Sequence, residues 1–100
     1  MMMENNVSDS GEFLRLEGVL LTEVPRERFC CCGNNPDGRM CILYGDGLWY
    51  VFFREGPLCE DLSVHRSFTD AALQLIRNVA PSEAAEERMR GLFLGKARPE

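Results

Sequence analysis

The sequence predicts an α+β domain in which an antiparallel meander of three to four strands carries an N-terminal helix and two C-terminal helices packed on the sheet. In the middle of the chain, two apolar, aromatic-rich runs flank a short Gly-containing loop, which is typical of a β-hairpin. On either side of this hairpin, apolar residues recur at helical spacing. We expect one domain over residues 12–95, a disordered start at 1–11 and a tail at 96–100.

The first helix is predicted over residues 12–24. Ser8, Asp9 and Ser10 are candidate N-caps. Gly18 weakens the helix, and Pro25 ends it because a residue before proline is biased towards extended geometry. Its apolar positions follow one helical face and are Phe13, Leu16, Leu20 and Val24.

The hairpin is predicted to consist of strands 39–44 and 48–54, joined by a turn at residues 45–47. Both faces of this hairpin are apolar, whereas a strand covered on one side alternates apolar with polar residues. The second face is therefore either covered by a helix or free as a binding surface, and the sequence leaves open which face the helices cover. The expected opposed pairs are Tyr44–Leu48, Leu43–Trp49, Ile42–Tyr50, Cys41–Val51 and Met40–Phe52.

A third strand is predicted over residues 61–66, because Leu62 and Val64 alternate there with polar residues. A helix over 70–79 follows, with Thr69 as its cap, and a last helix begins after Ser82. The apolar stripe of the last helix is expected to be Ala85, Met89, Leu92 and Phe93.

The charge balance narrows the function classes. The net charge of -5 argues against direct nucleic-acid binding and against an anionic membrane surface, but it suits a basic protein partner. Neither a signal peptide nor a membrane span is apparent, so a cytoplasmic location is expected.

The cysteines form the most unusual stretch of the chain, with four of the five between Cys30 and Cys41. No C-x-x-C pair is present, so a zinc site would need improvised ligands. Packing by small apolar side chains is favoured over a metal site or a redox switch, and no cofactor is expected. The ligands available to a metal site would be Cys30, Cys31, Cys32, Cys41, Cys59 and His65.

Catalytic motifs are lacking, and an enzyme is not expected. His65 is the sole histidine and has no evident Cys-His partner geometry. Glu55, Glu60 and Asp61 cluster near one loop, where a binding role is favoured over acid–base chemistry. Trp49 and its aromatic neighbours are either core residues or interface anchors.

Slightly more than half of the chain resembles small bacterial immunity proteins of polymorphic and contact-dependent toxin systems. The similar segments are "VPRERF", a Gly-Asn-Pro turn, "GDGLWYVFFREG", a short strand and "SFTDAALQLI". The most specific matches are Trp49, Val51, Arg54, Glu55, Gly56, Phe68 and Ala72. The cysteines are not part of this shared pattern.

The resemblance implies an antitoxin that binds one cognate toxin domain, a nuclease being one candidate, and blocks its active site. The acidic loops could then occupy a basic groove. The alternatives are a small self-associating regulatory module, with a homodimer formed through the hairpin face, and a thiol metal-binding protein. The interface candidates are Asp37, Asp46, Trp49, Glu55, Glu60 and Asp61.

Overall fold

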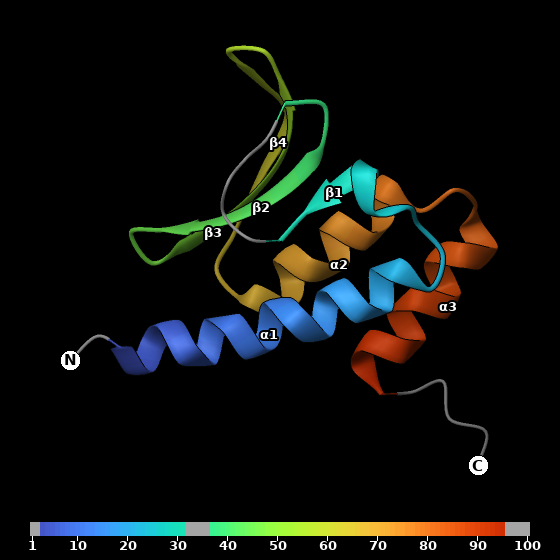
Figure 1. Ribbon diagram of the computed structural model, residues 1–100, viewed down its shortest axis with the longest axis horizontal. Helices are drawn as coiled ribbons and strands as arrows, with labels where there is room; N and C mark the ends of the chain where they lie inside the picture. The colour runs from blue at the N-terminus through green and yellow to red at the C-terminus, as the bar shows by residue number, and fades with distance from the viewer. Residues whose placement is uncertain (1–2, 32–36, 96–100) are drawn as a thin grey trace.

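The computed structural model describes residues 3–31 and 37–95, with side chains from residue 11 onward. It confirms the α+β fold: one four-stranded sheet in the order β1-β2-β3-β4, with three helices on one side of it (Figure 1). The elements are α1 (Met3–Leu21), the 3-10 turn η1 (Arg26–Arg28), β1 (Phe29–Cys30), β2 (Met40–Gly45), β3 (Leu48–Glu55), β4 (Leu58–His65), α2 (Phe68–Val79) and α3 (Glu83–Leu94).

Helix α1 is longer at its start than the sequence predicted. It begins at Met3 rather than at residue 12, so most of the stretch expected to be disordered belongs to the helix. It ends at Leu21, and the amide of Val24 then bonds to the carbonyl of Leu20 at 2.8 Å. Leu16 and Leu20 are fully buried, which confirms the predicted apolar stripe at these two positions.

The hairpin register differs by one residue from the predicted register. Gly45 opposes Leu48, and Tyr44 opposes Trp49. The turn therefore has only two residues, Asp46 and Gly47, with φ angles of 54° and 80°. Positive φ at both positions gives a type I′ turn, whose twist matches that of paired strands. A shift of one residue exchanges the two faces of a strand, so the predicted grouping of side chains was wrong.

The sheet is mixed rather than a pure meander. Phe29 and Cys30 form β1, which runs parallel to β2 and pairs with Met40 and Cys41. Strand β4 begins at Leu58, earlier than predicted, and pairs antiparallel with β3. Its pairing shifts register opposite Val51–Phe53, where Asp61 has a φ of 54°. This arrangement is a β-bulge, which bends the strand.

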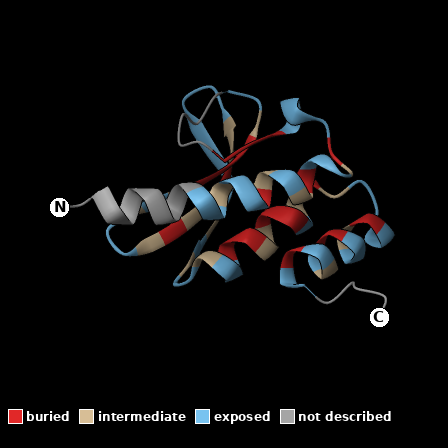
Figure 2. Cartoon of the chain, turned by 60° about the horizontal axis from the view of Figure 1, so that its bottom comes forward, coloured by how far each residue is buried: buried red, intermediate tan, exposed pale blue. Residues whose placement is uncertain are grey.

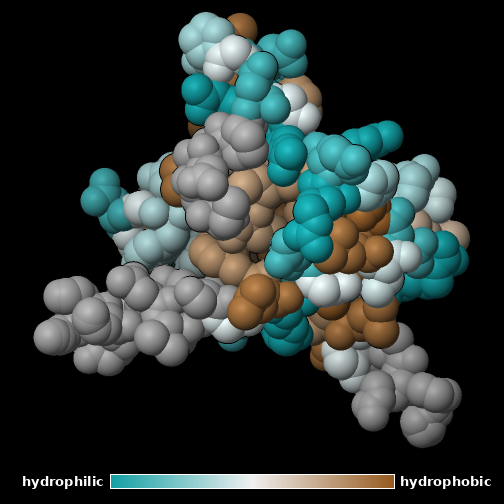
Figure 3. All heavy atoms as spheres, viewed as in Figure 1, coloured by the Kyte–Doolittle hydropathy of each residue, from teal (hydrophilic) through white to brown (hydrophobic). Residues whose placement is uncertain are grey.

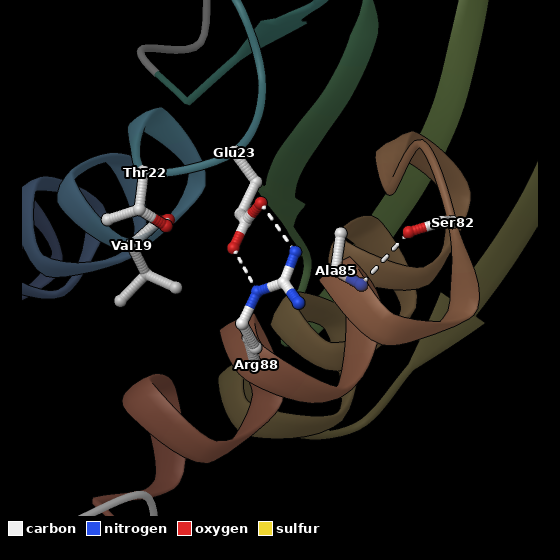
Figure 4. Close-up of polar contacts among 6 residues, drawn as sticks. All are labelled: Val19, Thr22, Glu23, Ser82, Ala85 and Arg88. Atoms are coloured by element: carbon white, nitrogen blue, oxygen red, sulfur yellow. Dashed lines mark hydrogen bonds and ion pairs between the residues drawn. The ribbon is translucent and has the colours of Figure 1, made fainter.

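The two C-terminal helices have serine caps. Ser67, rather than Thr69, caps α2: its Oγ accepts a hydrogen bond from the Asp70 amide at 3.1 Å. Ser82 caps α3 as predicted, accepting from the Ala85 amide at 3.1 Å (Figure 4). The predicted stripe of α3 is buried except at Leu92, which is exposed.

The main core lies between the helices and one face of the sheet. Figure 2 shows α2 as the most heavily buried helix, and it contacts β2, β3 and β4. Trp49 lies edge-on to Phe13 and Phe68, with ring centroids 5.9 and 5.0 Å away. These rings connect α1, β3 and α2. The sheet residues of this core are Phe29, Met40, Ile42, Trp49 and Val51.

Candidate functional site

The second face of the sheet, which we call the open face, has an apolar cluster of its own. Cys30, Cys41 and Phe52 are buried in this cluster, and Leu43 and Tyr50 pack against it. None of the described helical residues belongs to it. The sequence left undecided which face the helices cover, and the structure places them on the Trp49 side.

Strand β4 extends the open face towards the sheet edge. Val64 opposes Tyr50 and therefore lies on the same face, and Leu62 follows the same alternation. Both side chains are exposed, Leu62 to 55% and Val64 to 49%. A sheet face that meets water normally carries polar side chains, so the exposed Leu62 and Val64 are the part of this apolar face that a partner could reach.

Figure 3 shows hydrophobic residues in the middle of the molecule, with hydrophilic residues above them and to their right. Sequence reasoning considered Tyr50 only as one of the aromatic neighbours of Trp49, and it did not propose Leu43, Leu62 or Val64 as site residues. The signal that could have found them was the apolar character of both hairpin faces, combined with the correct two-residue turn.

Trp49, a predicted interface residue, lies in the main core. It is 7% exposed, and its ring contacts those of Phe13, Tyr44 and Phe68. Its position follows from the hairpin register, which turns it towards the helices. We therefore remove Trp49 from the candidate surface, because an anchor must reach the partner. Tyr50, on the opposite face of the same strand, takes its place.

Two of the predicted acidic residues, Asp37 and Glu55, lie at the turn between β3 and β4. The Asp37 carboxylate accepts a hydrogen bond from the amide of Gly56, which has a φ of 58°. Glu55 precedes this glycine directly and is exposed. The backbone amide of Gly38 also bonds to the Arg54 carbonyl at 2.7 Å. The approach to β2 is thereby joined to the end of β3.

The other acidic residues divide between the two ends of the hairpin. Glu60 on β4 opposes Phe53 of β3, and Asp61 forms the adjacent bulge. Both therefore lie near the end of the hairpin that holds Asp37 and Glu55. Asp46 lies in the β2–β3 turn, at the opposite end of β3. Four of the five predicted acidic residues therefore lie near one another, and we call them the acidic hairpin end: Asp37, Glu55, Glu60 and Asp61. Asp46 lies apart from them.

The cysteines are placed mostly in the interior. Cys30, Cys31 and Cys41 are buried, whereas Cys59 is exposed on β4. Cys32 lies outside the described residues. Among the residues that are described, no three His, Cys, Asp or Glu side chains are grouped so as to hold a metal ion. A packing role for Cys30, Cys31 and Cys41 agrees with their burial.

His65 does not form a catalytic pair with any described cysteine. Its Nε2 lies 2.8 Å from the Oγ of Ser63, two residues away on the helix side of β4. A shallow hollow near the end of α2 and the start of α3 is lined by charged residues of both signs, Arg77, Glu83, Glu86, Glu87 and Arg90.

No described helix is long and apolar enough to cross a membrane. Comparisons of the chain with models of protein families, with curated proteins and with solved structures found no match. The geometry of the open face and of the acidic hairpin end therefore carries the functional argument.

Proposed function

We propose that this protein is a cytoplasmic immunity protein, which binds and neutralises one cognate toxin domain without catalysing a reaction. The observation that carries the proposal is the apolar open face of the sheet, since all three helices lie on the other side (Figure 1). The similarity of the hairpin and α2 segments to immunity proteins supports the same function.

Tyr50 is the residue best suited to anchor the toxin. It lies on β3, one of the two inner strands, and is partly buried beside Phe52 and Leu43. Tyrosine contributes a large apolar surface and a hydroxyl group, and such residues are enriched among those that dominate binding energy. Leu62 and Val64 would extend the contact towards the sheet edge.

The acidic hairpin end supplies the charge for steering the complex. Asp37, Glu55, Glu60 and Asp61 lie at or near the β3–β4 turn, which projects from the helical layer (Figure 1). A toxin with a basic substrate groove, such as a nuclease, would be attracted to this end and blocked by it. Complementary charge raises the association rate most strongly at low ionic strength.

The test is a binding and activity assay with the toxin domain encoded beside this protein. We expect a stable complex and loss of toxin activity. Tyr50→Ala is expected to weaken binding at least tenfold, because truncating a buried anchor costs about 2 kcal/mol or more. Tyr44→Ala is the matched control, since Tyr44 is exposed on the other face of the hairpin.

The binding and activity assay tests the immunity function, and the two tyrosine variants test which surface binds the toxin. If the assay finds no complex and no protection from the toxin, the immunity proposal is refuted. Binding that is weakened by Tyr44→Ala but not by Tyr50→Ala would keep the function and refute the open face as its site. Circular dichroism of both variants checks that the fold is intact.

A further inference from the structure

Strand β4 forms a long unpaired edge of the sheet. The strand order places it beside β3 only, and six of its eight residues are exposed. The opposite edge, β1, has two residues, and both are buried. Among the described residues, no backbone hydrogen bond outside the regular elements involves β4. Such an edge presents unpaired N–H and C=O groups, which can accept another strand.

The bulge at Asp61 divides this edge into two parts. Bulges protect edges from pairing because they bend the strand. The part after the bulge, from Ser63 to His65, keeps a regular pairing with β3, and Leu62 lies next to it within the bulge. Leu62 and Val64 are both about half exposed. This regular part is the place where an added strand would fit.

The charged residues before and after this segment have opposite signs. Glu60 and Asp61 precede it, and Arg66 follows it; all three residues are exposed. An antiparallel pairing of two β4 strands about Ser63 would put Leu62 beside Val64 of the second copy. It would also bring the acidic end of each strand to Arg66 of the other copy. Opposite charges across strands stabilise a pair, whereas a parallel arrangement would align like charges.

We propose that β4 pairs antiparallel with β4 of a second copy of this chain, across a twofold axis at Ser63. The two sheets then join edge to edge in a self-complementary dimer. This contact differs from the hairpin-face dimer that the sequence suggested. Both open faces point to the same side of the joined sheet and stay free. The dimer therefore goes beyond the proposed immunity function and does not depend on it.

Sedimentation equilibrium of the intact chain, without any toxin, tests the pairing. We expect the wild type to dimerise in the micromolar to millimolar range at low salt. Leu62→Lys is expected to make the protein monomeric, because a charged side chain on an edge strand opposes pairing. Leu14→Lys, at a more exposed leucine of α1, is expected to leave the dimer intact.

A charge exchange tests the antiparallel direction. Glu60→Arg and Arg66→Glu are each expected to weaken the dimer about tenfold, since every substitution acts twice across the axis. The double variant restores opposite charges and is expected to regain wild-type affinity. A wild type that stays monomeric at millimolar concentration overturns the proposal. So does a dimer that Leu62→Lys leaves intact, or a double variant that stays as weak as the single variants.

Discussion

The carboxylate of Glu23 accepts two hydrogen bonds from the guanidinium of Arg88, with Nε 2.6 Å from Oε2 and Nη2 3.1 Å from Oε1 (Figure 4). This bidentate pair connects the chain just after α1 to α3, elements that are distant in sequence. The hydrogen bond from Arg88 lowers the pKa of Glu23 from its ordinary value of 4.5, and the same contact raises the pKa of Arg88.

The Glu23 pair makes stability depend on pH. Because the pKa of Glu23 is lowered in the folded state, the pair stabilises the fold above pH 4.5, and this stabilisation is lost as the pH falls through the lower folded value. Glu23→Gln is therefore expected to be less stable than the wild type at neutral pH, with a difference that shrinks in acid. Urea unfolding across this pH range measures the difference.

One result would contradict this account of the pair. A stability difference that stays constant from neutral to acidic pH would mean that the Glu23 charge does not contribute. High salt is expected to reduce the difference at neutral pH, since both side chains are partly exposed and are therefore screened. Glu87→Gln on the exposed side of α3 is the control, for which we expect little change.

Two leucines on α1 test how this helix packs. Leu16→Ala is expected to lower the free energy of unfolding by about 2–5 kcal/mol, because Leu16 is fully buried and its truncation leaves a cavity. Leu14→Ala removes the same atoms from a side chain that is 67% exposed and should cost less than about 0.5 kcal/mol. Equal effects in denaturant unfolding would show that α1 does not dock through this stripe.

Two glycines should respond in opposite directions to alanine. Gly47 has a φ of 80° in the β2–β3 turn, so Gly47→Ala is expected to cost about 1–2 kcal/mol of stability. Gly18 lies within α1 and has open space around it, so Gly18→Ala is expected to add about 0.5–1 kcal/mol. Thermal unfolding of both variants measures these effects. A stabilising Gly47→Ala would contradict the two-residue turn.

The thiols should differ in accessibility. Cys59 is exposed on β4, whereas Cys41 is fully buried. A thiol reagent applied to the native protein is expected to modify Cys59 quickly, so Cys59→Ser should remove one rapidly reacting group. Cys41→Ser should leave the rapid phase unchanged. A rapid phase that is lost with Cys41→Ser would mean that the cysteine stretch opens to solvent.

Sequence reasoning predicted the hairpin but missed its register, for a physical reason. Apolar residues fill both faces, so either register buries a comparable set of side chains, and alternation cannot choose between them. The Asp46-Gly47 dipeptide was the deciding signal, because both residues tolerate positive φ. The start of α2 was missed in a similar way: Ser67 and Thr69 are both suitable caps, and the backbone at Ser67 took the extended geometry of a cap.

The local pattern of residues determined the α+β class, the number of helices, the hairpin and the burial of most helical stripes, because these depend on near neighbours in the chain. The parallel addition of β1, the contact of Glu23 with Arg88 and the side of the sheet that faces the helices depend on residues far apart in sequence. Only packing decides such contacts. It buried Trp49 and left Tyr50, Leu62 and Val64 on the open face, which moved the candidate site to the other side of the hairpin.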